Sequence, residues 1–454
     1  MAENKDTRDI FKTLDLGLRI GEVLLSSGAG AADVGATMLN VAHGCGLRGA
    51  TADVTFTELA MSYQTSFDDP ALIQIRQVRH REIDYEDLTL VDHLVRDLLD
   101  GAIDRDQARS RLARIVSSGH RLPRWAVTLG WGAMGGGVGL LVGGSWPVAL
   151  LAAAASMGVD LIHRQMSRRR LPAFYQQVAG GLFATLIAVG TASTGVQVSP
   201  SLVVTAGIIM LLAGINFMGA IQDALTGFPL TAGARILEAL LATAGVIAGV
   251  SGGLTVGRLL GVDLGRLNPG ATSLSDIPVM SLGAALAAAA FAFACYAPVR
   301  TLVPIALVAA VTEVVFWLVR DRGLGVAWAS ATAAVLVGVV SYTVAGRVRV
   351  PPLVVVVPAV VPLLPGLSIY RGLSLLSAGG DGLLSMINAA AIAIALASGV
   401  IFGEYLAQPL KREARRLENR LSGPRLVGPL RARTVRRGGS RATRASRTSR
   451  AGTG

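Results

Sequence analysis

Several long stretches of this sequence contain no Asp, Glu, Lys or Arg. The two longest run from Trp125 to Val159 and from Leu171 to Gln222. A helix needs about 20 apolar residues to cross the hydrocarbon of a bilayer, so each of these two stretches has room for two spans. Further charge-free stretches occupy residues 239–257, 277–299, 323–346, 350–370 and 382–403. Soluble globular chains do not contain so many apolar runs, and the sequence therefore predicts a polytopic α-helical membrane protein.

The charge-free stretches divide into about ten expected spans. We place these spans near residues 125–143, 146–163, 172–191, 199–218, 233–256, 279–298, 301–319, 324–345, 351–369 and 386–407. An even number puts both termini on one side, together with the loop that carries Arg164, Arg168, Arg169 and Arg170. Because cytoplasmic loops are rich in Lys and Arg, we expect a multi-pass protein of the plasma membrane with both termini in the cytoplasm.

Residues 1–122 differ from the rest and predict a small cytoplasmic α/β domain. Apolar residues recur at helical spacing from Phe11 to Leu25 and from Tyr85 to Leu98. Thr51–Ser62 and Ala71–Arg79 alternate and are rich in Thr, Val and Ile, so we read them as two paired strands. Helices are expected also at 32–43 and at 104–117, where Asp104 and Gln107 have the spacing of a capping box. The predicted order is ααββαα.

The remainder of the chain divides into two membrane halves and a basic tail. We assign residues 123–263 and 277–410 to the two halves, with five spans each, and residues 411–454 to the tail. The tail holds fourteen Lys or Arg and two acids, and it supplies much of the net charge of +12. Such a composition predicts disorder and attraction to anionic lipid. No aromatic residue follows Tyr405, so specific nucleic-acid binding is not expected.

An internal repeat relates the two halves. The segment Pro200–Val204 is similar to Pro351–Val355, and Leu211–Asn216 is similar to Leu363–Ser368, one residue out of phase with the first match. Both matches fall in the fourth span of a group of five. Repeats with an odd number of spans have opposite orientations in the membrane, as in many secondary carriers. Chance similarity between apolar segments is the alternative explanation.

The stretch from Gly214 to Glu238 is the strongest candidate for a transport site. It mixes polar groups and helix breakers with apolar residues, namely Gly214, Asn216, Asp223, Gly227, Pro229, Gly233 and Arg235. Backbone groups freed by a helix break are tolerated at membrane depth only where they face protein or a watery cavity. Carriers bind their substrates at such broken helices. An ordinary turn at the membrane surface is the competing interpretation.

Four acidic residues fall within or at the ends of the expected spans. A carboxylate in hydrocarbon costs a few kcal/mol, so it should face a cavity or a partner. Burial favours the protonated form of a carboxyl group, which makes Glu238 and Glu313 the candidates for proton coupling. Asp160 and Glu404 lie near the expected cytoplasmic ends, where snorkelling or a salt bridge to the arginine cluster is favoured over proton coupling.

Short motifs along the chain resemble the threonine/serine exporter family. They are Leu212-Ala213-Gly214, Asp223, Gly227 and Gly233-Ala234-Arg235 in the first half, Leu363-Leu364-Pro365-Gly366 in the second, and the segments Gly21–Ala29 and Ile83–Leu99 before them. The family pattern has a proline before the first-half glycine, where this chain has Ala213. The resemblance implies a cytoplasmic domain followed by ten spans in two groups of five. It also implies export of small hydroxylated amino acids driven by the proton gradient, with Pro365 and Gly366 added to the transport path.

Two other classes of function stay open at this stage. The first 120 residues contain no His-Glu-x-x-His or Gly-x-Ser-x-Gly motif, so a membrane-anchored hydrolase has no specific residue support. A membrane sensor is the third reading. Cys45 and Cys295 form no metal pattern, and no cofactor is expected. The expected partners are small polar amino acids, protons and lipid, and the sequence leaves self-association into a homo-oligomer open.

Overall fold

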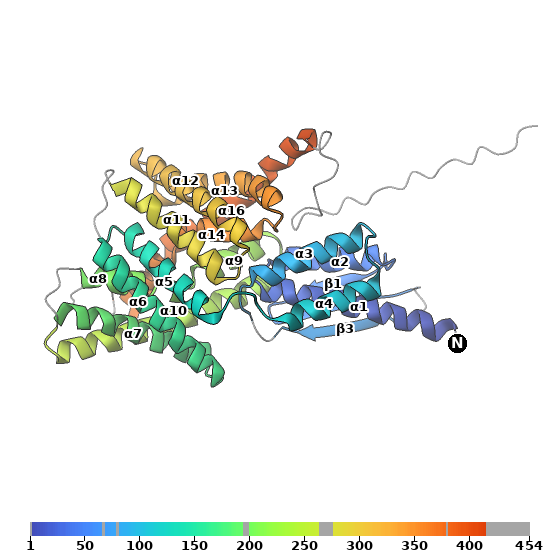
Figure 1. Ribbon diagram of the computed structural model, residues 1–454, viewed down its shortest axis with the longest axis horizontal. Helices are drawn as coiled ribbons and strands as arrows, with labels where there is room; N and C mark the ends of the chain where they lie inside the picture. Colours follow the sequence, from blue (N-terminus) through green and yellow to red (C-terminus); the bar gives the residue numbers. More distant parts are fainter. Residues whose placement is uncertain are drawn as a thin grey trace, which may run out of the picture.

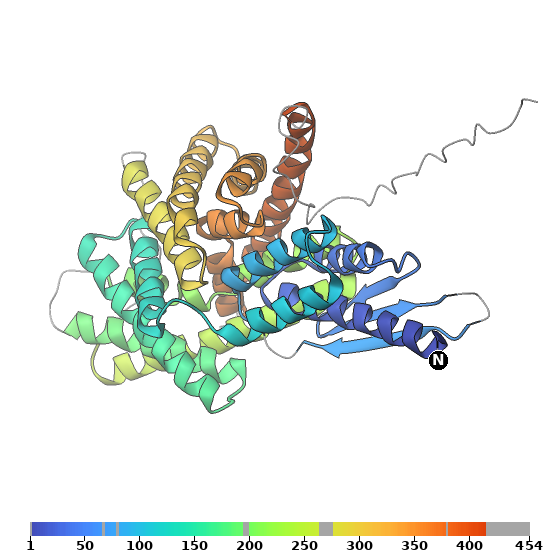
Figure 2. The same cartoon turned by 45° about the vertical axis from the view of Figure 1, so that its right-hand side comes forward.

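The structure is a computed structural model that describes residues 2–65, 69–78, 81–193, 199–262, 276–377 and 380–414. It has two parts, a unit of helices and strands formed by the N-terminal residues and a bundle of longer helices beside it (Figure 1). Figure 2 shows the same two parts after a turn, with the strands on the side of the N-terminal unit away from the bundle. We call the first part, α1 to α4, the N-terminal unit and the second the membrane bundle.

The N-terminal unit packs four helices against a three-stranded antiparallel sheet of order β1-β2-β3. The elements are α1 (Ala2–Ser26), α2 (Ala31–Gly44), β1 (Thr51–Val54), β2 (Glu58–Tyr63), β3 (Leu72–Gln77), α3 (Tyr85–Leu99) and α4 (Arg105–Ser118). The core is built from the apolar positions of these elements, with Leu14, Met38 and Leu88 fully buried. The predicted capping box is present at the start of α4, where Asp104 and Gln107 bond each other's backbone N–H groups.

The predicted order of two strands is wrong, because the first predicted strand is a hairpin. Thr51 pairs with Ser62, and the chain turns between them, with the Thr55 N–H donating to the Glu58 carbonyl at 2.9 Å. The turn contains Thr55, Phe56 and Thr57, none of which is a typical turn residue. The composition of the segment therefore gave no sign of the reversal.

In the part of the chain that the structure describes, the membrane bundle follows as ten helical segments, two of them broken. The elements are α5 (Arg124–Leu141), α6 (Trp146–Arg168), α7 (Ala173–Ser193), α8 (Pro200–Gly207), η1 (Ile209–Leu211), α9 (Gly214–Leu225), α10 (Pro229–Leu259), α11 (Ile277–Ala294), η3 (Val299–Thr301), α12 (Leu302–Asp321), α13 (Val326–Val348), α14 (Leu353–Val360), η4 (Val361–Leu363), α15 (Gly366–Ser377) and α16 (Leu383–Ala414). Within the described ranges, seven helices are long and apolar enough to cross a membrane, or nine if each bent pair is one span. The chain is therefore a polytopic helical membrane protein.

Helix α5 is the segment that leaves the expected number of ten spans unsettled. It covers the predicted first span, but six of its eighteen residues are glycine, which lowers its hydropathy. The glycines serve close packing against α11. A Cβ atom on Gly137 would lie 2.7 Å from the Ala287 backbone nitrogen, and one on Gly283 would lie 2.6 Å from the Leu141 nitrogen. Small residues at such crossings let two helix backbones approach closely.

The elements of the two halves repeat at a nearly constant spacing. Helices α5, α6, α7 and α8 begin 153 residues before α11, η3, α13 and α14, while η1 and α9 precede η4 and α15 by 152. The same pairs of helices also pack together in each half, such as α7 with α10 and α13 with α16. The match of 211–216 with 363–368 agrees with this spacing. The match of Pro200 with Pro351 is displaced, since α14 begins at Leu353.

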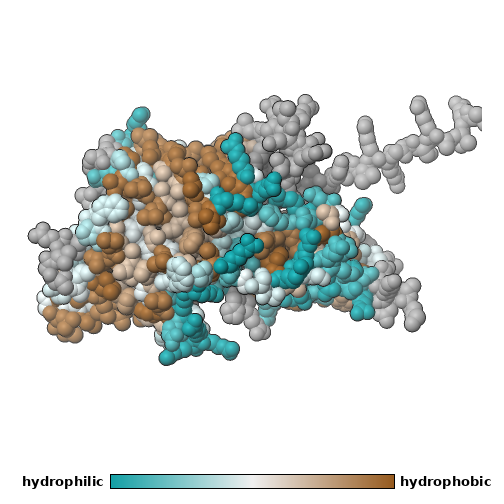
Figure 3. All heavy atoms as spheres, in the orientation of Figure 1, coloured by the Kyte–Doolittle hydropathy of each residue, from teal (hydrophilic) through white to brown (hydrophobic). Residues whose placement is uncertain are grey.

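The surface divides in the same way as the fold. Apolar residues cover the bundle, and hydrophilic residues cover most of the N-terminal unit (Figure 3). Large apolar side chains of the bundle are exposed, among them Leu150, Leu230, Val303 and Leu307. Exposed apolar residues in this number are expected of helices whose outer faces contact lipid. Helix α16 continues to Ala414, and the rest of the predicted tail lies outside the described residues.

Candidate functional site

The fourth segment of each half is broken at the position that the sequence singled out. The chain bends by 46° between α8–η1 and α9, and by the same angle between α14–η4 and α15. At both breaks a leucine is extended, Leu212 with ψ 131° and Leu364 with ψ 140°. The first break forms with Ala213 where the second has Pro365. A proline is therefore not needed for the first break.

The two breaks contact each other. A Cβ atom on Gly214 would lie 3.0 Å from the Leu364 Cβ, and one on Gly366 would lie 2.9 Å from the Leu212 Cβ. Each glycine thus packs against the extended leucine of the other half. Any larger residue at either position would push the two broken helices apart.

Directly after the first break, Asp223 and Arg235 form a buried ion pair. The Asp223 Oδ2 and the Arg235 Nη1 are 3.0 Å apart, and the two side chains are 1% and 10% exposed. Asp223 lies near the end of α9 and Arg235 in the second turn of α10, and Gly227 makes the turn between them with φ +96°. Only glycine adopts such a backbone without strain, which accounts for this residue of the motif.

The ion pair also holds the N-terminal unit. The Ala31 N–H, at the start of α2, donates to Asp223 Oδ1 at 2.9 Å, and the Arg235 guanidinium donates to the Ala29 carbonyl at 3.4 Å. The N-terminus of a helix favours a negative charge, so the carboxylate is well placed there. Asp223 and Arg235 therefore join the bundle to the segment Gly28–Ala31 of the N-terminal unit.

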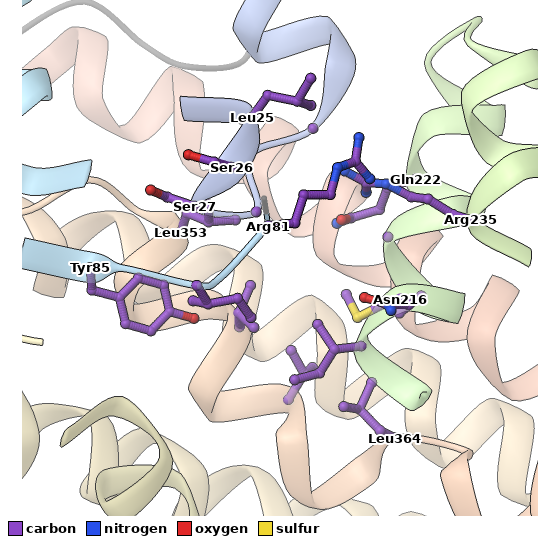
Figure 4. A pocket seen from close by; sticks show the side chains of 18 of the residues that line it. Leu25, Ser26, Ser27, Arg81, Tyr85, Asn216, Gln222, Arg235, Leu353 and Leu364 are labelled. Carbon is purple, nitrogen blue, oxygen red and sulfur yellow. The ribbon is translucent and has the colours of Figure 1, made fainter. Parts of the chain in front are cut away.

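A cavity of about 140 Å³ lies beside this contact, between the N-terminal unit and the broken helices (Figure 4). Its wall is contributed by the end of α1, the segment before α3, and helices α9, α10 and α14. The polar side chains that line it are Ser26, Ser27, Arg81, Tyr85, Asn216, Gln222, Arg235 and Glu238. Pockets for drug-sized ligands have volumes of roughly 300–1,000 Å³, so this cavity suits a much smaller solute.

Two guanidinium groups make one side of the cavity positive. Figure 4 shows Arg81, Gln222 and Arg235 close together. Burial, and then the charge of Arg235, lower the pKa of Arg81 to about 10, against the opposing charges of Glu238 and Asp223. Arg81 donates to the Phe56 carbonyl and stacks on the Phe56 ring, but its buried Nε has no partner among the described residues. A small anionic group would satisfy this donor.

Besides Asp223 of the bundle, an acid of the N-terminal unit also lies at this contact. Asp33 lies in the first turn of α2, and a Cβ atom on Gly30 would be 3.9 Å from its Oδ2 and 3.5 Å from Asp223 Oδ1. Burial raises the pKa of Asp33 well above 3.8, and the charges of Glu404 and Asp223 raise it further. The protonated form of Asp33 is therefore favoured where α2 meets the bundle.

The structure gathers most of the predicted site residues and separates others. Asn216, Arg235 and Glu238 line the cavity, Asp223 pairs with Arg235, and Gly214, Pro365 and Gly366 lie at the contact of the two breaks. Gly233 lies on an exposed face, and a Cβ there would meet nothing within 4 Å. Glu238 is exposed, so the burial behind its predicted role in proton coupling is not found in this conformation. Glu313 is buried on α12, outside the cavity wall.

Sequence reasoning missed the contribution of the N-terminal unit to this cavity. Ser26, Ser27 and Arg81 were not singled out, although Ser26 and Ser27 belong to the family-like segment Gly21–Ala29. Gln222 was missed as well, although it is adjacent to Asp223. A family resemblance in a segment with no chemical motif was the one available sign that the segment meets a functional site.

Family models and two related proteins match nearly the whole chain, and all of them are described as threonine/serine exporters. Residues 15–257 match a family model described as "Putative threonine/serine exporter", and residues 280–406 match one described as "Threonine/Serine exporter, ThrE". A "Probable threonine/serine exporter" of Mycobacterium tuberculosis is 36% identical over 425 residues, which cover 91% of this chain and 80% of the relative. A "Threonine/serine exporter" of Corynebacterium glutamicum is 32% identical over 418 residues, covering 90% and 85%. No solved structure matches.

Proposed function

The chain belongs to the threonine/serine exporter family, and on this basis we propose that it is a secondary transporter of small polar amino acids such as threonine and serine. The observation that carries the proposal is the small cavity at the broken helix of the first half. Its wall combines two arginines, a glutamate and uncharged polar groups. A zwitterion with a short polar side chain presents the complementary groups.

We assign the groups of the substrate by charge. Its carboxylate binds the guanidinium groups of Arg81 and Arg235, since guanidinium recognises carboxylates in a planar, bidentate way. Its ammonium group faces Glu238, on the same helix as Arg235. Asn216 and Ser26 are the candidates for the side-chain hydroxyl. In this arrangement Asp223 positions Arg235 through their ion pair and does not itself bind the substrate.

The two broken segments provide the moving parts of the transport cycle. Bundles built from two related halves commonly expose a central site to one side and then the other by rocking one half against the other. The contact of Gly214 with Leu364 and of Gly366 with Leu212 is where such a motion would act. We propose that the proton-motive force drives it, so that export proceeds against a substrate gradient.

The proposed topology is ten spans in two groups of five, with both termini in the cytoplasm. The N-terminal unit contacts the turns after α11 and α13: the Tyr85 N–H donates to the Cys295 carbonyl at 2.9 Å, and His93 Nε2 lies 3.0 Å from the Arg349 carbonyl. Arg300 and Arg349 lie at these turns, where the Arg300 guanidinium donates to the Arg349 carbonyl, so basic residues lie beside the N-terminal unit. By the positive-inside rule this arrangement supports a cytoplasmic position for the N-terminal unit. Binding of anionic lipid by the tail and self-association remain predictions.

Flux through the purified protein in liposomes tests the substrate and the driving force together. Liposomes loaded with labelled threonine should release it through the protein, and an imposed pH gradient should increase the release. Arg81→Gln should lower the flux at limiting threonine by roughly tenfold or more, because a hydrogen bond to a charged group contributes about 1.5–3 kcal/mol.

The matched control is Arg111→Gln, which removes an exposed arginine of the same unit that pairs with Asp97. It should transport like the parent protein. An absence of threonine and serine flux under every gradient would contradict the substrate assignment. Equal loss in Arg81→Gln and Arg111→Gln would contradict the role of the cavity.

A further inference from the structure

The repeat relates two buried acids that lie outside the cavity. At the spacing of 153 residues that separates α5 from α11 and α6 from η3 and α12, Asp160 corresponds to Glu313. On the same spacing Thr128 corresponds to Ser281 and Arg164 to Trp317. Helices α5 and α6 pack together, as do α11 and α12. The two halves therefore contain the same three positions with different side chains.

In the first half the acid contacts both of the other groups. Asp160 accepts a hydrogen bond from Thr128 Oγ1 at 2.8 Å, and its Oδ2 lies 2.9 Å from Arg164 Nη2. Both partners of the ion pair are largely buried, with 8% of Asp160 and 23% of Arg164 exposed. Because arginine keeps its charge in proteins, this carboxylate is neutralised permanently. The predicted salt bridge between Asp160 and the arginine cluster is present.

In the second half no ion pair of the carboxyl group is found among the described residues. Glu313 is 4% exposed and its Oε1 accepts one hydrogen bond, from Trp317 Nε1 at 2.8 Å. Within the described ranges, Glu313 Oε2 and Ser281 Oγ are buried without a hydrogen-bond partner. Arg320, one turn beyond Trp317, stacks on the Trp317 ring at 4.6 Å, and its charge reaches Glu313 from there without a described ion pair.

Among the described residues, the charged groups on the elements around Glu313 lie at the ends of those elements. Helices α11 and α14 and the turn η4 contain no ionisable residue. Helix α13 contributes Tyr342 and, at its end, Arg347, while η3 contributes Arg300 and α12 ends with Arg320 and Asp321. An uncompensated carboxylate in such a place costs several kcal/mol.

We propose that Glu313 and Ser281 form a proton-binding site, and that the mobile proton does in the second half what Arg164 does in the first. The proton adds to the free Glu313 Oε2 and neutralises the carboxyl group. Ser281, which corresponds to Thr128 of the first half, is the candidate to accept a hydrogen bond from the resulting O–H. Release of the proton restores the carboxylate. Two oxygens are too few to replace the six or more oxygen ligands of a hard metal cation.

This site is placed to act on the broken segment of the second half. Helix α12 packs against both α14 and η4, and α11 does so as well. The segment η4 ends at Leu363, one residue before the extended Leu364 that meets Gly214. A change of charge between α11 and α12 therefore acts one element away from the contact of the two breaks. This inference rests on the proposed transport function.

Transport at several imposed pH gradients tests the coupling. Glu313→Gln should remove the dependence of threonine flux on the gradient, because the site can no longer gain or lose a proton. Trp317→Arg should do the same, because it introduces the fixed cation of the first half. Trp317→Phe, which adds no charge, is the matched control and should keep the dependence. A full gradient dependence in Glu313→Gln would overturn the proposal.

An infrared titration of the protein in nanodiscs tests the site without transport. The parent protein should show the carbonyl stretch of a protonated carboxylic acid, which disappears as the pH rises and is absent from Glu313→Gln and Trp317→Arg. If the parent and Glu313→Gln have the same band at every pH, the inference fails. If threonine flux is absent but the band behaves as expected, the proton site stands and the substrate assignment fails.

Discussion

The ion pair of Asp223 and Arg235 joins two parts of the molecule that are distant in sequence. Its two residues were predicted from their place after a broken helix, and the structure places them 3.0 Å apart. Their third partner, the Ala31 N–H, could not be predicted. A backbone N–H carries no mark in the sequence, and its position depends on how α2 packs against the bundle.

Breaking this pair should lower transport. In Asp223→Asn or Arg235→Ala, one charge stays buried without its partner, a change that costs about 3–5 kcal/mol at buried sites. We expect flux to fall by roughly tenfold or more, since about 1.4 kcal/mol corresponds to a factor of ten. Membrane insertion should be unaffected, because it depends on the apolar spans. Flux and the amount of protein in membranes are the two measurements.

The control for this prediction is an exposed pair of the same chemistry. Asp97 and Arg111 lie 3.0 Å apart with nearly half of each side chain exposed, and such surface pairs contribute about 0–1 kcal/mol. Asp97→Asn should therefore transport normally. Normal flux in Asp223→Asn and Arg235→Ala as well would remove the ion pair from the transport mechanism.

Among the elements, the two helix breaks are the most important for the proposed transport mechanism. Every predicted span overlaps a helix or a bent pair, because long apolar runs leave few alternatives. The hairpin of β1 and β2 was missed for the opposite reason, since short strands depend on pairing that composition does not encode. The contact between the breaks was also beyond prediction, because it depends on how the two halves face each other.

The glycines of the motif should respond differently to substitution. Gly214→Val and Gly366→Ala should lower the thermal stability and the flux, since each added side chain meets a leucine of the other half and overpacking costs about 1–3 kcal/mol. Gly233→Ala should be stabilising by up to about 1 kcal/mol, because its Cβ would be free of contacts and alanine favours the helix. Thermal unfolding in detergent measures all three. Equal destabilisation would contradict the packing at the breaks.

A proline at position 213 should be tolerated. Ala213 has φ −78°, close to the proline value, and Leu212 before it is extended, as a residue before proline must be. The Ala213 N–H donates no backbone hydrogen bond among the described residues. We expect Ala213→Pro to leave flux intact and to raise stability by about 0.4–1 kcal/mol. Ala220→Pro, inside α9, should cost about 3 kcal/mol, and similar losses in both variants would contradict the break.

At the scale of the whole molecule, the N-terminal unit and the bundle share one site. The loop Gly28–Ala31 bonds to Asp223 and Arg235, and one hydrophobic core extends from Leu88 in the unit to Phe291 in the bundle. The unit closes one side of the cavity that contains Asn216 and Glu238. Its movement would change access to the cavity, so we regard it as part of the transport machinery.

The contact between the two parts should weaken as the pH rises. The pKa of Asp33 is raised in the docked state by burial and by the charges of Glu404 and Asp223. The docked state therefore binds the proton more tightly than the undocked state. Protonation of Asp33 therefore stabilises the docked state. This stabilisation is complete below the ordinary pKa near 3.8 and is lost as the pH rises through the raised pKa that Asp33 has in the docked state.

Asp33→Asn should keep the contact at high pH, because the amide cannot ionise. Hydrogen exchange of the Ala31 amide, corrected for the intrinsic pH dependence, reports the contact directly. Protection should fall with pH in the parent protein and stay constant in Asp33→Asn. The same decline in both proteins would show that another group controls the contact.

The position of the substrate is the central claim, and thiol labelling in the cavity tests it most directly. Ser26→Cys places a thiol in the cavity wall, and Cys45→Ser removes the partly exposed native thiol while Cys295 stays buried. We predict that threonine and serine slow the labelling of Cys at position 26 and that Arg81→Gln abolishes this protection. Labelling at an unchanged rate in saturating threonine, by a protein that still transports threonine, would contradict a site between the N-terminal unit and the broken helices.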